Sequence, residues 1–178
     1  VYTNAWMKLP VGKARYGLML REDGIVMDDG TTTRISENHY HMTTTTAQAA
    51  NVLSHLEYYL QIVWPELNVN VVSTTEQWAG AAIAGPKSRD MLSKLYPDLD
   101  VSNEALPFMG YKEAEFFGVP SRIFRISFSG ELAYEINVKS DHGMFMWEKM
   151  MEVGKEFGNQ PYGTEALSTL RIEMGHVA

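Results

Sequence analysis

The stretch Arg122-Ile-Phe-Arg-Ile-Ser-Phe-Ser-Gly-Glu-Leu-Ala-Tyr-Glu-Ile-Asn-Val138 joins two runs typical of β-strands and places one acid, Glu135, inside an apolar segment. Isoleucine, phenylalanine, tyrosine and valine favour the pleated surface of a sheet, and Ser129-Gly-Glu131 separates the two runs as a turn would. The stretch therefore predicts neighbouring strands. An acid in such a strand needs a partner, because an unpaired buried charge costs several kcal/mol.

Two kinds of partner would satisfy Glu135. A salt bridge to Arg122, Arg125 or Arg171 is the simpler one, and spacing alone favours it. The alternative is a bound molecule, because a carboxylate can accept two hydrogen bonds from an amino-pyrimidine edge, as carboxylates do from the exocyclic amines of nucleobases. The neighbouring Tyr134 is one of several aromatic residues that could stack on a flat heterocycle.

The rest of the chain predicts an α+β fold with antiparallel or mixed sheets and crossing helices. Asp23-Gly24 between apolar runs is a strong hairpin signal, and Gly118-Val-Pro120 predicts a second hairpin. We expect strands over residues 14–20, 25–27, 31–35, 39–44, 69–75, 78–84, 111–117, 121–128 and 132–138. We expect helices over residues 46–63, 87–95, 141–154 and 163–175.

Length and composition indicate one domain or two closely joined lobes. The chain has 178 residues, of which 45% are hydrophobic, enough to bury about two thirds of its extended surface. We expect one domain over residues 1–178, with sub-lobes 1–103 and 104–178. The absence of cysteine excludes disulfides and a cysteine nucleophile, and it favours the cytoplasm as the compartment. The chain starts without methionine and stops without a polar tail, so we expect a fragment of a larger chain.

The charge and hydropathy pattern argue against two classes of partner. The formal net charge is -7, with 15 scattered basic residues. Nucleic-acid binding depends largely on clustered lysine and arginine, so we expect no nucleic-acid partner. No apolar run approaches the ~20 residues needed to span a bilayer. We therefore expect no membrane partner, while an anionic small ligand remains compatible with this charge.

Asp28 and Asp29 are the second pair of acids of interest. They end an apolar run just before Gly30, and alternation along a strand would send their carboxylates to opposite faces. Only one of them would then point into a cleft, where a carboxylate could hold or accept a proton beside a reacting amine. A plain turn is the structural alternative, because aspartate is common before glycine in turns.

Other patterns indicate little chemistry. His39 and His41 would share one face of a strand, but no nearby acid or cysteine completes a metal site, so we expect none. The threonine run at residues 43–46 could donate hydroxyls to a ligand, or simply lead into a helix cap. No glycine-rich phosphate loop and no nucleophile elbow appear in the sequence.

The motifs resemble the folate-binding aminomethyltransferase family, typified by the T protein of the glycine cleavage system. Within that family, the chain is most similar to the C-terminal part of the alpha subunit of heterotetrameric sarcosine oxidases. The resemblance covers nearly the whole chain. Its most specific pieces are Val11–Gly24, Val26–Asp29, Thr75–Trp78, Ala84–Pro86, Arg125–Ile136, Tyr162–Leu167 and Leu170–Gly175.

The resemblance implies roles for individual residues. It implies that Asp29 is the carboxylate beside the reactive nitrogens of the folate, with Asp28 as the second choice. It implies that Glu135 holds the amino-pyrimidine edge of the pterin. The residues implied to lie around the same ligand are Tyr134, Phe108 and Thr44, with Arg171 as a candidate for the glutamate tail. The T protein carries an arginine where this chain has Glu165, and the sarcosine oxidase branch shares that difference.

The resemblance also implies an activity. A flavin site elsewhere in the parent complex would oxidise sarcosine, and this part would convert the released one-carbon unit and tetrahydrofolate into 5,10-methylenetetrahydrofolate. FAD, FMN and NAD are expected in the parent complex outside this chain, and the other subunits of a heterotetrameric sarcosine oxidase are expected partners. The alternatives are a T-protein-type aminomethyltransferase, a dimethylglycine-type demethylating enzyme, and a folate-binding regulatory module without chemistry of its own.

Overall fold

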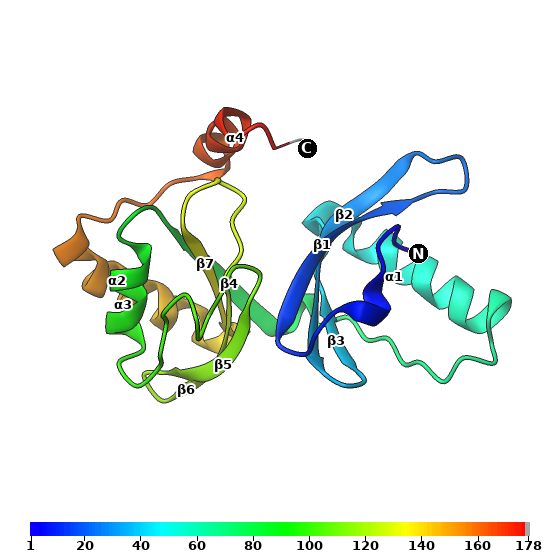
Figure 1. The fold of residues 1–178 in the computed structure, drawn as a ribbon, viewed down its shortest axis with the longest axis horizontal. Helices are drawn as coiled ribbons and strands as arrows, with labels where there is room; N and C mark the ends of the chain where they lie inside the picture. The colour runs from blue at the N-terminus through cyan, green and yellow to red at the C-terminus, as the bar shows by residue number, and fades with distance from the viewer. Residues whose placement is uncertain (177–178) are drawn as a thin grey trace. The chain divides into compact units, whose positions relative to one another are not determined.

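The computed structural model describes residues 1–176 and divides into two compact units, Val1–Glu76 and a second unit that begins at Gln77 (Figure 1). Each unit contains one antiparallel sheet followed by a helix in the chain. The predicted α+β class is confirmed, and every strand pairing in the described residues is antiparallel.

The first unit is a three-stranded meander in the order β1-β2-β3, formed by β1 (Lys13–Leu20), β2 (Val26–Ser36) and β3 (His39–Met42). The hairpin predicted at Asp23-Gly24 is confirmed. Gly24 adopts φ +81°, which most residues with a side chain avoid, and the Asp23 carboxylate accepts a hydrogen bond from the Ile25 amide at 2.9 Å.

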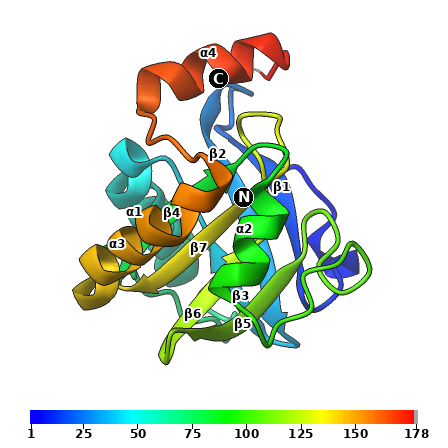
Figure 2. The ribbon, with the colours of Figure 1, turned by 90° about the vertical axis from the view of Figure 1, so that its left-hand side faces the viewer.

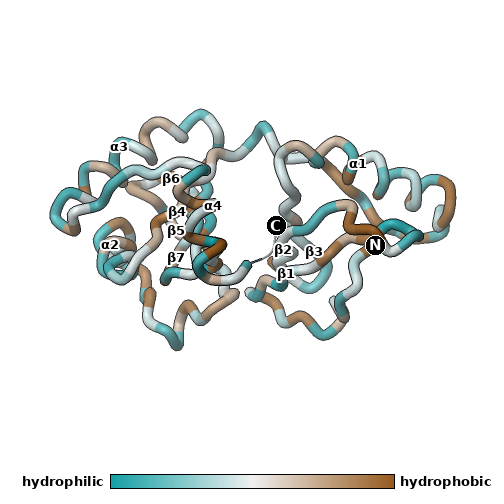
Figure 3. Tube along the Cα trace, turned by 90° about the horizontal axis from the view of Figure 1, so that it is seen from above, coloured by the Kyte–Doolittle hydropathy of each residue, from teal (hydrophilic) through white to brown (hydrophobic). Residues whose placement is uncertain are grey.

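The helical run of the first unit is broken into three parts. It starts as a 3-10 turn (Thr46–Gln48), continues as α1 (Ala49–Tyr58) and ends as a π-helical turn (Tyr59–Val63). The predicted limits, 46 and 63, agree with these bounds. The apolar residues at the end of this run are brown in Figure 3, and they are exposed: Ile62 is 65% exposed.

Two expectations for residues 69–84 were wrong in part. Residues 69–74 form no strand, because Val69, Val71 and Val72 are exposed and no strand in the described part of the chain pairs with them. The strand at residues 78–84 does form, but it pairs with the last strand of the second sheet. The compact units consequently divide between Glu76 and Gln77 instead of between residues 103 and 104.

The second unit is built on a four-stranded sheet in the order β4-β7-β6-β5. Helices α2 (Ser88–Leu95) and α3 (Gly143–Gly154) cover one face of this sheet (Figure 2). The remaining face carries neither of these helices. The four strands are β4 (Trp78–Ala84), β5 (Tyr111–Phe116), β6 (Val119–Phe124) and β7 (Ala133–Lys139).

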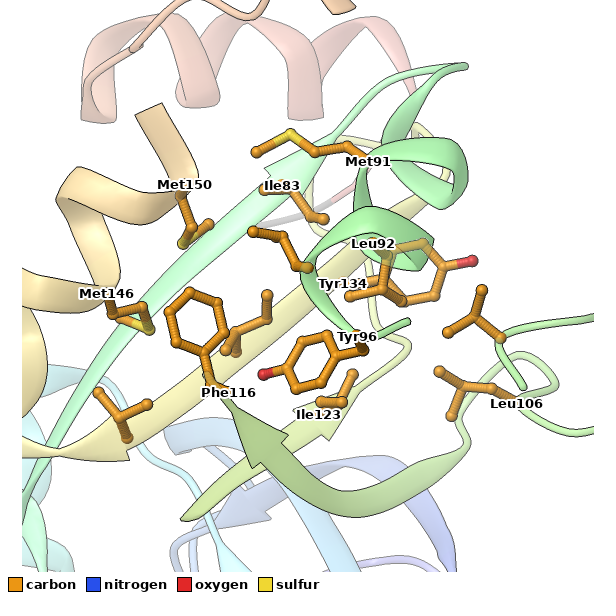
Figure 4. Close-up of a cluster of buried hydrophobic side chains, with 14 residues drawn as sticks. Ile83, Met91, Leu92, Tyr96, Leu106, Phe116, Ile123, Tyr134, Met146 and Met150 are labelled. Carbon is orange, nitrogen blue, oxygen red and sulfur yellow. The ribbon is translucent and has the colours of Figure 1, made fainter. Parts of the chain in front are cut away.

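The main hydrophobic core lies between this sheet and its two helices (Figure 4). Alternate residues of β7 and the apolar stripe of α2 meet in it, as expected for a strand and a helix with one buried face. Phe116, Ile136 and Leu92 have no exposed surface. The same cluster includes Ile83, Met91, Leu95, Tyr96, Val101, Leu106, Ile123, Tyr134, Val138, Met146 and Met150.

The last helix, α4 (Thr164–Glu173), agrees with the predicted position. The chain just after it packs on the loop between β6 and β7. A side-chain carbon at Gly130, which has φ +81°, would lie 1.8 Å from the Met174 side chain. Glycine at this position therefore allows both the turn and the close approach of Met174.

Candidate ligand-binding site

The alternation of β7 divides its side chains between two faces of the second sheet. Tyr134, Ile136 and Val138 are fully buried in the core. Glu135 and Asn137 are only partly buried and belong to the opposite face, which α2 and α3 leave uncovered. Tyr134 therefore does not share a surface with Glu135, although it is adjacent in sequence. Its ring packs in the core, where its hydroxyl has no hydrogen-bond partner among the described residues.

The neighbours of Glu135 are small on one side and aromatic on the other. In register, Glu135 lies opposite Ala82 on β4 and opposite Phe124 on β6. Ala82 and Gly80 are both exposed, so the outer strand carries almost no side-chain bulk on this face. A flat molecule can thus approach the Glu135 carboxylate over β4.

The Glu135 carboxylate has no hydrogen-bond or salt-bridge partner among residues 1–176. Burial raises its pKa above the ordinary value for glutamate, because a charge in this setting is poorly solvated and no cation offsets that cost. A partly buried carboxylate left in this state is uncommon, since buried polar groups are nearly always hydrogen-bonded. This combination marks Glu135 as a candidate for binding a donor from outside the chain.

The arginines that could have neutralised Glu135 are held elsewhere. The guanidinium of Arg122 lies over the Trp78 ring, 4.0 Å from its centroid, and its Nε is 3.9 Å from the Glu113 carboxylate. Arg171 donates to the backbone carbonyl of His176 at 2.9 Å. The salt bridge favoured by spacing is therefore wrong for Arg122 and Arg171.

Arg125 is held by the loop before β5. It donates to the Leu106 carbonyl at 3.0 Å and to the Asn103 side chain at 2.8 Å. The Met109 amide in turn donates to the Arg125 carbonyl at 2.9 Å, and Met109 adopts the left-handed φ of +59°. This anchored loop presents Phe108, whose side chain is 64% exposed. Phe108 is therefore a surface ring on a fixed support.

Asp28 and Asp29 of the first unit have different surroundings, as the alternation of a strand requires. Asp28 is buried, and it accepts hydrogen bonds from the Thr45 hydroxyl at 2.8 Å and from the Thr45 amide at 3.1 Å. Asp29 is partly exposed and accepts a hydrogen bond from the Tyr16 hydroxyl at 2.7 Å. Asp28 thus joins β2 to the start of the helical run, whereas Asp29 stays accessible.

Tyr16 and Thr45 were not singled out from the sequence. Partial burial and the hydrogen bond to Asp29 raise the pKa of Tyr16 to about 12, so it remains a donor near neutral pH. The sequence signal for Tyr16 is register: residues on paired strands of a hairpin with the same side preference can reach one another diagonally. Nothing in the local sequence distinguishes Thr45 from the adjacent threonines.

Thr44 lies in the connection between β3 and the helical run and is partly buried. Its hydroxyl donates to the Thr45 carbonyl at 3.0 Å. The preceding Thr43 ties this connection to β2, because its hydroxyl accepts a hydrogen bond from the Thr31 amide at 3.0 Å. Thr44 thus sits beside the residue that binds Asp28.

Two hollows on the surface lie apart from these acids. One, of 370 Å³, is lined by Trp78, Glu113 and Arg122 among others; the second, of 560 Å³, lies between the first hairpin turn and His55. Among the described residues, no cluster of three or more histidine, aspartate or glutamate side chains is suited to hold a metal ion. No described helix has the length and apolar character needed to cross a membrane.

The fold and the site define an α+β protein in which acids on strands, without metal-ligating clusters in the described residues, are the candidates for ligand binding. The chain belongs to the family described as the GCVT N-terminal domain, whose model matches residues 1–178. The resemblance drawn from the motifs is confirmed by this match.

Two relatives illustrate the range of the family. The chain is 56% identical over 179 residues to "Sarcosine oxidase subunit alpha" of Rhizobium meliloti (strain 1021), covering 99% of this chain and 18% of that protein. It is 32% identical over 174 residues to "Aminomethyltransferase" of Chloroherpeton thalassium (strain ATCC 35110 / GB-78), covering 98% of this chain and 46% of that protein. The chain thus spans less than a fifth of the first relative and under half of the second.

A solved structure shows the same fold. The glycine cleavage system aminomethyltransferase T from Bartonella henselae superimposes with a TM-score of 0.77 at 22% sequence identity, covering 96% of this chain and 43% of that chain. At this identity the likeness establishes the fold alone.

Proposed function

We propose that this chain binds tetrahydrofolate and, as part of a sarcosine oxidase alpha subunit, provides the site where the one-carbon unit from sarcosine becomes 5,10-methylenetetrahydrofolate. The single observation that carries the proposal is the Glu135 carboxylate, partly buried and without a partner among the described residues. The 56% identity to a sarcosine oxidase alpha subunit supports the choice of parent enzyme.

The chemistry of Glu135 fits the pterin ring. The 2-amino group and N3–H of a pterin are adjacent donors, and an ionised carboxylate offers two acceptor oxygens to match them. The exposed Ala82 leaves room for the ring over β4. Phe108 provides an exposed aromatic face in the same unit, suited to contact with a heterocycle.

Asp29 is the better candidate for handling protons. The Asp28 oxygens are occupied by Thr45, and that side chain is buried. Asp29 is accessible, and its hydrogen bond from Tyr16 uses only part of its acceptor capacity. Its carboxylate can accept a proton from an amine and return it to a leaving group.

Bound tetrahydrofolate would supply the amines, N5 and N10, that take up the one-carbon unit. The contribution of the chain is to hold the pterin by Glu135 and to present a carboxylate, so catalysis rests mainly on proximity. Oxidation of sarcosine would occur at a flavin outside this chain, and FAD, FMN and NAD are proposed for that part of the complex. The other subunits of such an oxidase are the proposed partners.

A T-protein-type aminomethyltransferase is the second candidate. The relatives with that name are 32% identical or less among those compared above, against 56% for the oxidase subunit. Glu165 also replaces the arginine that the T-protein resemblance would require near the glutamate tail. Both observations favour the oxidase assignment, and Arg171, which binds a backbone carbonyl, stays a proposed contact of the tail.

The test uses the full-length protein and two variants. Titration calorimetry with folinic acid should give an affinity about 10- to 100-fold lower for Glu135→Gln, because a hydrogen bond to a charged group is lost or weakened. Asp29→Asn should bind folinic acid normally but form little methylenetetrahydrofolate from sarcosine. The matched control, Glu148→Gln, changes an exposed acid on α3 and should affect neither measurement. Unchanged affinity in Glu135→Gln would refute the proposal.

A further inference from the structure

Asn137 is a second polar residue on the surface that carries Glu135. It lies two residues further along β7, so its side chain belongs to the same face. Its register partner on β4 is Gly80, and the Asn137 Oδ1 atom is 3.1 Å from where a side-chain carbon at Gly80 would be. The position of Oδ1 confirms the face, and the glycine leaves the space that the amide occupies.

The Asn137 amide has no hydrogen-bond partner within the described part of the chain, and the residue is partly buried. Its neighbour Glu135 is in the same condition. Two adjacent polar side chains without partners on one open face point to a ligand with several polar atoms, because polar groups at such positions are normally satisfied.

Arg122 would be the stronger donor on this face, but it is directed elsewhere. It is the register partner of Asn137 on β6, yet its guanidinium stacks over Trp78 and lies near Glu113. The Asn137 amide is therefore the nearest uncommitted donor beside the Glu135 carboxylate.

The two side chains together match a definite order of polar atoms. Glu135, when ionised, provides only acceptors, whereas the Asn137 amide provides an NH₂ donor as well as an acceptor. A 4-oxopteridine presents, along one ring edge, the 2-amino donor, the N3–H donor and the 4-oxo acceptor. A 2,4-diaminopteridine has a donor in place of that last acceptor.

We propose that the Asn137 amide donates a hydrogen bond to the 4-oxo group of the pterin held by Glu135, and so selects 4-oxopteridines against 2,4-diaminopteridines. This inference rests on the proposed function. It adds a specificity-determining residue that reads the part of the ring edge Glu135 cannot read as an acceptor.

The test compares folic acid and aminopterin, which differ at position 4 only in the oxo or amino group. Both are titrated into the full-length protein and its Asn137→Ala and Asn137→Asp variants. We expect Asn137→Ala to weaken folic acid about 3- to 10-fold, the range for one neutral hydrogen bond, while aminopterin changes less than about twofold. Asn137→Asp should shift the ratio of the two affinities further toward aminopterin, because a carboxylate accepts from a 4-amino group.

The outcomes separate this inference from the function on which it rests. If Glu135→Gln weakens both compounds but the affinity ratio is the same in Asn137→Ala and the native protein, the role of Asn137 is refuted and folate binding stands. If the native protein binds neither compound, both proposals fail. A thermal unfolding curve for each variant confirms that a loss of affinity does not reflect a loss of folding.

Discussion

The Glu135 side chain shows how far a single residue can be understood from sequence. Its place in a strand, on the face opposite Ile136, follows from alternation. Its freedom from a salt bridge does not, because spacing allowed Arg122, Arg125 and Arg171 equally. The structure shows that a tryptophan ring, a loop carbonyl and a helix end hold these arginines, and each of those contacts depends on tertiary packing.

The raised pKa of Glu135 predicts a pH dependence of stability. The folded chain keeps this proton to a higher pH than the unfolded chain, because burial disfavours the carboxylate. As pH rises from the ordinary glutamate pKa to the raised value, the unfolded state loses its proton first, so the free energy of unfolding falls. Above the raised value the loss is complete.

We therefore expect Glu135→Gln to gain free energy of unfolding relative to the native protein between pH 4 and pH 7. Urea unfolding of both proteins at the two pH values measures the difference. Glu148→Gln, an exposed acid on α3, should show no such change. A difference between Glu135→Gln and the native protein that is equal at both pH values would contradict the assignment.

Asp28 and Asp29 should differ in their contribution to stability. In Asp28→Asn the side chain keeps one acceptor oxygen, so one of the two hydrogen bonds from Thr45 is lost inside the fold. We expect a loss of about 1–3 kcal/mol in the free energy of unfolding. Asp29→Asn keeps an acceptor for Tyr16 at a more accessible position and should lie within about 0.5 kcal/mol of the native protein. Equal losses in urea denaturation would show that both acids are structural.

At the scale of elements, the sequence predicted what local pattern controls. The Asp23-Gly24 hairpin, the strand at Ala133–Lys139 and helices α2 and α3 all occur as expected, because turn residues and apolar periodicity mark them locally. The strand expected at residues 69–75 does not occur. Its valines satisfy strand preference, but a strand also needs a hydrogen-bonded neighbour, which no local pattern provides.

The loop at Gly130 predicts a measurable link between β7 and the end of α4. Gly130 has φ +81° and faces Met174, whereas Gly118 has φ +83° and nothing within 4 Å of an added side-chain carbon. Gly118→Ala should therefore cost only the backbone strain, about 1 kcal/mol. Gly130→Ala should cost that amount and also displace Met174. Hydrogen exchange of the α4 amides should accelerate only in Gly130→Ala. Equal effects of both variants would mean that the contact with Met174 does not hold α4.

At the scale of the whole molecule, the family and the α+β fold were predictable because motifs spread over nearly the whole chain carry them. The division between Glu76 and Gln77 was not, since it depends on the pairing of β4 with β7, strands about fifty residues apart. Roles that involve other parts of a longer protein also exceed the chain, which spans 18% of its oxidase relative.

The most direct test of the account is a crystal structure of the full-length protein with folinic acid bound. We expect the two oxygens of Glu135 to lie about 2.7–3.1 Å from the 2-amino nitrogen and N3 of the pterin. A bound pterin whose amino-pyrimidine edge contacts other residues, with the Glu135 carboxylate still unpaired, would contradict it.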